Sequence, residues 1–152
     1  MSDSNTELLK RFASATGCTF VEAHYSGFPL NAKILDRTGK VIAVAEVTVR
    51  ADKISAHSHF MQTIWRLEEG KDASAEHKVP YLILCKFADA DRLYEYAPSH
   101  KFERRSGDGK SPREQRAISG SVFIPMTYFK KFEQWTVPEK KITEDGFEEV
   151  EF

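Results

Sequence analysis

The sequence predicts an α/β domain in which helices cover both faces of a β-sheet. Residues 41–45, Val-Ile-Ala-Val-Ala, form an uninterrupted apolar run, and residues 81–87 are apolar at all positions but Lys86. Such runs are typical of strands that are buried on both faces. Segments with apolar residues at helical spacing precede and separate the two runs, and this alternation indicates an α/β sheet.

The chain is expected to begin with an amphipathic helix and a short strand. Ser4 or Asn5 can cap the helix, and Gly17 is placed to end it. The apolar stripe of this helix consists of Leu8, Leu9, Phe12 and Ala15. Residues 18–23 then form a strand that leads into a turn-rich loop.

A β-hairpin and a second helix are expected next. Residues 31–36 and 41–49 flank the connection Arg37-Thr38-Gly39-Lys40, which predicts the hairpin. From Ile54 to about Lys71 the sequence predicts a helix that ends near Gly70. Its apolar stripe would be Phe60, Met61, Ile64, Trp65 and Leu67.

The remaining part predicts a second hairpin, a loop and a closing unit. Residues 81–87 and 92–96 are the strands of the hairpin. Residues 99–120 are polar and rich in Gly, Ser and Arg, so we expect a long loop there. Residues 121–124 then predict a strand, and residues 126–135 predict a helix after Pro125.

Length and composition suit one packed domain. A chain of 152 residues fits a single domain, which we assign to residues 1–136, followed by an acidic tail at 137–152. The formal net charge is only -1, so contact with nucleic acid must come from a local basic patch. The two cysteines, Cys18 and Cys85, lie in apolar stretches, which favours buried free thiols and a cytoplasmic location. The N-terminus predicts neither a signal peptide nor a membrane span.

Two short motifs stand on the strands of the first hairpin. Pro29-Leu30-Asn31 opens one strand, and Glu46-Val47-Thr48 lies on its partner. With this order of elements, the chain resembles the PD-(D/E)XK nuclease superfamily, whose motifs are Pro-x-Asp and Glu-x-Lys. The resemblance implies a restriction-endonuclease-like core: a central mixed β-sheet flanked by helices, in the order α-β-β-β-α-β-β, then a closing strand and helix.

The hairpin geometry places the polar residues of both motifs on one face. If Asp36 pairs with Val41, counting back along the strands puts Asn31 opposite Glu46. Because side chains alternate along a strand, Thr48 projects on the same face as Glu46. A carboxylate in an otherwise apolar strand needs a partner, so something should face Glu46.

The resemblance implies metal-dependent chemistry with altered residues. In an active nuclease of this kind two carboxylates hold Mg²⁺, and a lysine stabilises the developing charge. Asn31 replaces a carboxylate and Thr48 replaces the lysine, so Glu46 and Asn31 would form a weakened Mg²⁺ site. Lys53 is the preferred substitute cation. The other candidates for a relocated catalytic role are Glu22, Asp36, His57 and Gln62.

Two other chemistries have little support. His57 and His59 are spaced by two, which on a helix turns their rings to different sides, and neither a Cys nor a second pair completes a zinc site. A Gly-x-Ser-x-Gly motif for acyl hydrolysis is absent from the sequence.

A basic segment is the candidate nucleic-acid contact. Within residues 101–116, five arginines and lysines are the candidates for phosphate binding: Arg104, Arg105, Lys110, Arg113 and Arg116. Gln62, followed by Arg66, could touch a substrate backbone. Related phage and prophage nucleases carry a similar segment before an Ile-Pro and an aromatic-rich helix, which Phe123-Ile124-Pro125 and Tyr128-Phe129 resemble.

Three functions stay open. The first is a divergent nuclease-fold protein that binds DNA and, if active, is a metal-dependent endo- or exodeoxyribonuclease. The second is a catalytically inactive pseudonuclease, phage-encoded or not, that serves as a nucleic-acid or protein interaction module. The third is a structural or oligomer-forming domain, which leaves Glu46 unexplained. DNA is the expected partner; a protein partner and a homodimer stay open.

Overall fold

A five-stranded mixed sheet forms the centre of the molecule. The computed structural model describes residues 3–22, 30–105 and 120–138. The strand order is β1-β2-β3-β5-β6, and only the β3–β5 pair is parallel. A mixed central sheet is therefore confirmed. Its strands are β1 (Thr19–Glu22), β2 (Ala32–Leu35), β3 (Val41–Val49), β5 (Tyr81–Lys86) and β6 (Asp91–Glu95).

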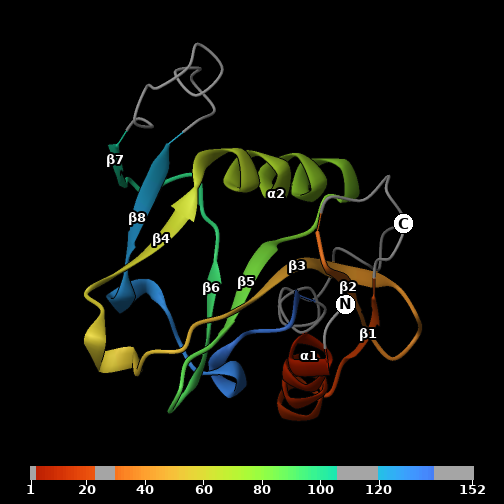
Figure 1. Cartoon of the computed structure of the whole chain (residues 1–152). Helices are drawn as coiled ribbons and strands as arrows, with labels where there is room; N and C mark the ends of the chain where they lie inside the picture. The colour runs from red at the N-terminus through yellow and green to blue at the C-terminus, as the bar shows by residue number, and fades with distance from the viewer. Residues whose placement is uncertain (1–2, 23–29, 106–119, 139–152) are drawn as a thin grey trace.

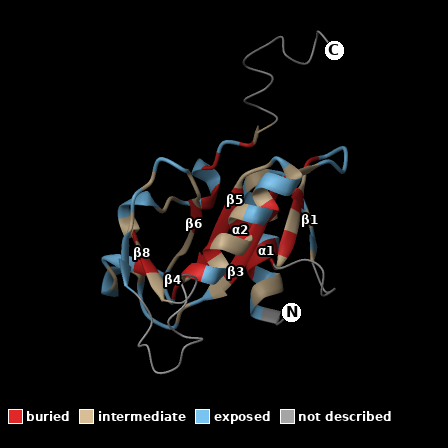
Figure 2. Cartoon of the chain, turned by 90° about the horizontal axis from the view of Figure 1, so that it is seen from above, coloured by how far each residue is buried: buried red, intermediate tan, exposed pale blue. Residues whose placement is uncertain are grey.

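One helix packs on each face of this sheet (Figure 1). Helix α1 (Asp3–Thr16) packs on one face of β3, and α2 (Ile64–His77) packs on the other. Because β3 is covered on both sides, its residues 42–47 are all buried. Figure 2, seen from the α2 side, shows the buried strands β3 and β5 beneath this helix. The fold thus explains the two uninterrupted apolar runs of the sequence, because the strands that carry them are buried on both faces.

The first helix is present, with Leu8, Leu9 and Phe12 buried, but Ser4 and Asn5 lie inside it and do not cap it, and Ala15 is exposed. Gly17 follows α1 and adopts a φ of 77°, the left-handed conformation that suits a helix end. Cys18 and Cys85 are both buried, as predicted. Burial raises the pKa of the Cys85 thiol to about 12, so it stays protonated at neutral pH. Neither α1 nor α2 has the length and apolarity that a membrane-spanning helix needs.

A second, three-stranded sheet replaces part of the predicted second helix. Its order is β4-β8-β7, with β4 at His59–Thr63, β8 at Ser121–Pro125 and β7 at Glu103–Arg105. The prediction of a helix from Ile54 was wrong, because Ile54–Ala56 is a single 3-10 turn and α2 begins only at Ile64. On β4 the buried Phe60 alternates with the exposed Met61, so the period is that of a strand.

The end of α2 also differs from the prediction. The helix continues past Gly70 to His77, and Lys78 takes the left-handed conformation at the C-cap with a φ of 57°. Gly70 faces the ring of Tyr81 on β5, where a β-carbon would overlap the ring atoms. This glycine is therefore required by helix–sheet contact and does not end the helix.

The closing segment is extended, with two short 3-10 turns in place of the predicted helix at 126–135. The turns are Met126–Tyr128 and Phe132–Gln134. Between them, Lys130 exchanges two backbone hydrogen bonds with Leu93 of β6, at 2.8 and 2.9 Å. Phe132 then packs edge-on against Phe12 of α1. Pairing with the sheet edge and burial of aromatic rings outweigh helix formation here.

Of the C-terminal region, 137–138 are described, and Val137 is buried against the α1 side of the core. The remaining residues of the expected acidic tail lie outside the described part of the chain. The predicted strand at 121–124 is confirmed as β8. Of the predicted loop at 99–120, Glu103–Arg105 form β7, while 106–119 lie outside the description.

We predict that Gly70→Ala destabilises the protein. Alanine gains roughly 1 kcal/mol of helix propensity over glycine, but overlap with the buried Tyr81 ring should cost about 1–3 kcal/mol or more. Urea unfolding should show a net loss of stability. Glu76→Ala, at an exposed position of the same helix, is the control and should change stability by less than about 0.5 kcal/mol. A Gly70→Ala protein as stable as the control would contradict this packing.

Candidate functional site

The register of the first hairpin ends one residue short of Asn31. Ala32 pairs with Ala45 and Ile34 with Ala43, and the backbone N–H of Asn31, which precedes β2, donates to the Ala45 carbonyl oxygen at 3.1 Å. Asn31 thus lies beside the part of β3 that carries Glu46, and its direct pairing with Glu46 stays a prediction. The expected pairing of Asp36 with Val41 is wrong, because the register shifts between Ile34 and Leu35, and Val41 pairs with Leu35.

Asp36 is part of the turn between β2 and β3. One oxygen of its carboxylate accepts hydrogen bonds from the backbone of Thr38 and Lys40 at 2.9 and 3.0 Å, and from the Thr38 hydroxyl at 2.7 Å. This pattern is that of an Asx turn, which stabilises the loop locally. Asp36 thus has a structural role at the turn.

The Glu46 carboxylate is buried and receives hydrogen bonds from three other elements. Its side chain has a relative exposure of 5%. Gln62 of β4 donates to both carboxylate oxygens, at 2.8 and 2.9 Å, and the Tyr81 hydroxyl of β5 donates at 2.9 Å. Nε of Arg66 on α2 donates at 3.2 Å and also supplies the opposite charge. The expectation that something faces Glu46 is therefore confirmed.

The orientation of the Gln62 amide follows from its two neighbours. Its Nε2 faces the Glu46 carboxylate, while its Oε1 accepts a hydrogen bond of 3.0 Å from the backbone N–H of Thr63, the N-cap residue of α2. In the reverse orientation, Oε1 would face the carboxylate oxygens of Glu46 and Nε2 would face the backbone N–H of Thr63, so acceptor would meet acceptor and donor would meet donor. Gln62 therefore links the buried carboxylate to the start of the helix.

The Tyr81 hydroxyl stays protonated and therefore keeps donating its hydrogen bond to the same carboxylate. Burial, and then the charge of Glu46, raise the pKa of Tyr81 well above its usual value. A higher pKa keeps the hydroxyl protonated at neutral pH and well above it. The hydrogen bond to Glu46 is thus not expected to change with pH near neutrality.

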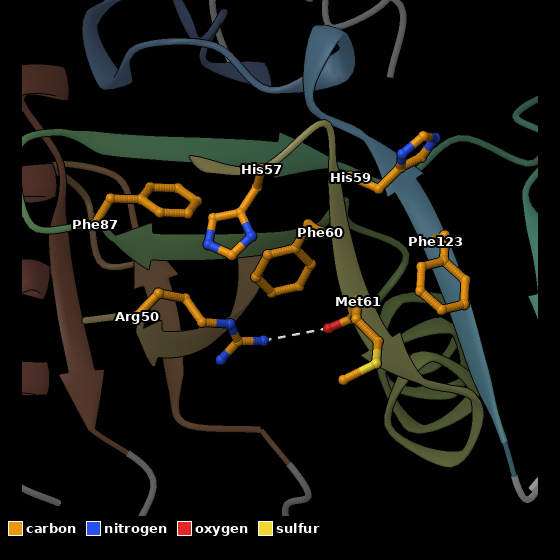
Figure 3. A pocket seen from close by; sticks show the side chains of 7 residues that line it. All are labelled: Arg50, His57, His59, Phe60, Met61, Phe87 and Phe123. Carbon is orange, nitrogen blue, oxygen red and sulfur yellow. Dashed lines mark hydrogen bonds between the residues drawn. The ribbon is translucent and has the colours of Figure 1, made fainter. Parts of the chain in front are cut away.

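Asn31 and Thr48 are both engaged away from Glu46. Oδ1 of Asn31 accepts a hydrogen bond of 2.7 Å from the backbone N–H of Val47. The Thr48 hydroxyl accepts one of 2.8 Å from Nη1 of Arg50. Arg50 also donates to the carbonyl oxygen of Met61 at 3.2 Å, and its guanidinium lies 4.5 Å from the centre of the Phe60 ring (Figure 3).

Arg50 is one of the site residues that sequence reasoning missed. It stands two positions after Thr48, so strand alternation places it on the same side as Thr48 and Glu46. That spacing could have identified it as the cation next to the substituted lysine position. Lys53, the preferred substitute, is exposed, and no ion pair joins it to Glu46 in the part of the chain that the structure describes.

The other relocation candidates also have local partners. Oε2 of Glu22 accepts a hydrogen bond of 2.7 Å from Thr6 on α1, at the β1 edge of the sheet. Nε2 of His57 lies 3.4 Å from a carboxylate oxygen of Asp52. His59 is exposed on β4 and contacts Ser58 at 3.0 Å. Neither histidine belongs to a metal-binding group among the described residues.

The described residues around Glu46 do not fit a Mg²⁺ ion. Mg²⁺ requires free oxygen ligands in near-octahedral arrangement. Both Glu46 oxygens already accept hydrogen bonds, one of them from the cationic Arg66, and Oδ1 of Asn31 is bound to the backbone. Among residues 3–22, 30–105 and 120–138, no group of three or more acidic, His or Cys side chains could hold a metal.

The predicted nucleic-acid contacts are distributed over three places. Arg104 and Arg105 lie exposed on β7, whereas Gln62 is buried on β4 and not on the helix face expected for it. Lys110, Arg113 and Arg116 lie outside the described residues. Arg104 lines a cavity of about 300 Å³ together with two lysines and two aromatic residues: Lys71, Lys101, Tyr96 and Phe102.

We predict that Tyr81→Phe lowers the free energy of unfolding by about 1.5–3 kcal/mol, because a buried carboxylate loses one of its donors. Tyr96→Phe is a matched control, since Tyr96 is only partly buried next to the same sheet. Its stability should change by less than about 0.5 kcal/mol. Equal stability of Tyr81→Phe and the unmodified protein in urea unfolding would mean that Glu46 does not depend on this hydroxyl.

The fold has a counterpart among solved structures. It is similar to that of Hjc, a Holliday junction resolvase from the archaeal hyperthermophile Archaeoglobus fulgidus, with a TM-score of 0.56 and 13% sequence identity. The likeness covers 85% of this chain and 96% of that one. No protein-family model and no curated protein sequence matches the chain. At this identity the likeness concerns the fold, and it supports the restriction-endonuclease-like core that the sequence predicts.

Proposed function

We propose that this protein is a nucleic-acid-binding protein of nuclease-like fold whose former catalytic carboxylate now serves a structural role. The observation that carries the proposal is the closed environment of Glu46. Its carboxylate stands where the resemblance expects a metal ligand, yet it is buried and bound by Gln62, Tyr81 and Arg66. This is the interaction-module alternative and not the active nuclease.

The arrangement disfavours phosphodiester cleavage at this position. A metal ion would have to displace both Gln62 and Arg66 from Glu46, leaving their donor groups unpaired. The loss of one preorganised transition-state donor alone costs about 10²- to 10³-fold in rate. Asn31 and Thr48 remove a second carboxylate and a cation, so the combined loss would leave little turnover.

Binding of nucleic acid is supported by the cationic surface beside α2. Lys71, Lys101 and Arg104 line one cavity, and none of the described residues that line it is acidic. Lys71 does form an ion pair of 3.3 Å with Glu68 on the helix. A cluster of cations next to aromatic rings is suited to the phosphate backbone of nucleic acid. The similar solved structure is that of a Holliday junction resolvase, which agrees with DNA as the partner.

A cleavage assay tests the catalytic half of the proposal. The unmodified protein should leave plasmid, single-stranded DNA and a four-way DNA junction uncut in Mg²⁺ or Mn²⁺. Glu46→Ala controls for contaminating nuclease, and the Asn31→Asp, Thr48→Lys double substitution restores the two motif residues. Cleavage by the double substitution alone would support a pseudonuclease. Cleavage by the unmodified protein that Glu46→Ala abolishes would overturn the proposal in favour of the active nuclease.

Salt dependence tests the binding half. Lys101→Ala and Arg104→Ala should each weaken DNA binding, because each removes one cation that neutralises a phosphate. The slope of log K against log salt should fall in magnitude by about 0.9 for each phosphate of duplex DNA that is no longer neutralised. Arg37→Ala, at an exposed cation in the β2–β3 turn, removes the same charge elsewhere and should leave the slope unchanged. Equal slopes for all three variants would exclude this cavity as the binding surface.

A further inference from the structure

A second cavity, of about 460 Å³, lies beyond the end of β3. Three phenylalanine rings line it: Phe60 from β4, Phe87 after β5 and Phe123 from β8 (Figure 3). Its volume is within the range of roughly 300–1,000 Å³ that is usual for sites of small ligands. Among the described residues, those that line it include Arg50 and two histidines but no carboxylate. The cavity therefore offers apolar walls to a planar group.

Arg50 presents a fixed planar cation to this cavity. Its guanidinium is held by Thr48, by the Met61 carbonyl oxygen and by the face of Phe60. A guanidinium whose position is already fixed loses little conformational entropy when it stacks on a ring or binds a phosphate. Arg50 can thus contact a planar group or the anion attached to it.

His57 contributes a ring nitrogen whose contact with the protein is incomplete. Its Nε2 makes no hydrogen bond among the described residues, but it lies 3.4 Å from a carboxylate oxygen of Asp52. Buried polar atoms of this kind are uncommon and call for an explanation. The edge of a nucleobase carries the donors and acceptors that such a ring nitrogen can bind.

A second guanidinium lies over one of the lining rings. Arg105 of β7 stands 4.6 Å from the centre of the Phe123 ring, and it pairs with Glu103 at 3.4 Å. The same strand carries Arg104, which lines the cationic cavity beside α2. The two cavities therefore meet at β7, where the adjacent Arg104 and Arg105 point to opposite faces of the strand.

We propose that the cavity lined by Arg50, His57, Phe60, Phe87 and Phe123 binds an unpaired nucleobase. This inference rests on the proposed function and specifies its substrate class: nucleic acid with a base outside the duplex stack. Aromatic rings stack on the base, and Arg50 and Arg105 face the adjoining phosphates. Charge complementarity favours nucleic acid, because the charged group that lines the cavity among the described residues is the Arg50 guanidinium and no described carboxylate lines it. Next to the cavity, the Arg105 guanidinium is paired with Glu103, and Asp52 lies beside His57.

The test compares three DNAs that differ at one position: a perfect duplex, the same duplex with one bulged base, and the same bulge carrying an abasic residue. The abasic bulge keeps the flexible backbone but lacks the base. The base-bearing bulge should bind about 5- to 100-fold more tightly than the abasic bulge, as expected for stacking of one base on aromatic rings. Fluorescence of 2-aminopurine at the bulge should change on binding.

Matched variants assign this preference to the cavity. Phe123→Ala, at a half-buried position, should remove most of the preference, whereas Phe123→Tyr retains a ring and should keep it. Tyr128→Ala removes an exposed aromatic residue that lines a different cavity and should leave the preference intact. Circular dichroism and thermal unfolding establish that each variant is folded.

The outcomes separate this inference from the proposed function. Equal binding of all three DNAs would overturn the inference and leave the proposed function standing. Absence of binding to any nucleic acid would overturn both. Binding of a short acidic, tyrosine-containing peptide that Phe123→Ala abolishes, without any preference for the bulged base, would assign the cavity to a protein partner and likewise overturn the inference.

Discussion

One buried carboxylate connects the two sheets of this molecule. Glu46 stands in the central sheet, and its donors come from β4 in the small sheet, from α2 and from β5. A charge without partners in this position would be strongly unfavourable, so the elements that carry the donors must keep their places. The position of the small sheet against β3 therefore depends on satisfying Glu46.

The hydrogen bonds that hold Glu46 also keep it from the metal-dependent chemistry that the resemblance implies. A carboxylate that holds three elements together is not available to a metal ion without loss of those bonds. Two cavities nevertheless lie beside the small sheet, one lined by cations near α2 and one by phenylalanines beyond β3, and we propose both as contacts for nucleic acid. Under the proposed function, a nuclease-like scaffold keeps its contacts with nucleic acid while the position of the catalytic carboxylate becomes part of the core.

The sequence predicted the features that depend on local patterns. The strands that are buried on both faces, the mixed sheet and the position of Asn31 beside β3 follow from apolar runs and alternation. The sequence did not reveal β4, because Phe60, Met61 and Ile64 fit helical spacing as well as they fit a strand followed by a helix. It also did not reveal Gln62 and Tyr81 as partners of Glu46, since those contacts join residues 16 and 35 positions apart. Such contacts are set by tertiary packing, which periodicity does not report.

The central claim is that Glu46 stabilises the fold, and its most direct test is the free energy of unfolding of Glu46→Gln in urea. The substitution keeps the shape but turns one acceptor into a donor that faces other donors. Stability should fall by roughly 2–4 kcal/mol. Catalytic carboxylates are often retained at a cost in stability. Unchanged or increased stability of Glu46→Gln would therefore contradict a structural role and return Glu46 to the candidates for catalysis.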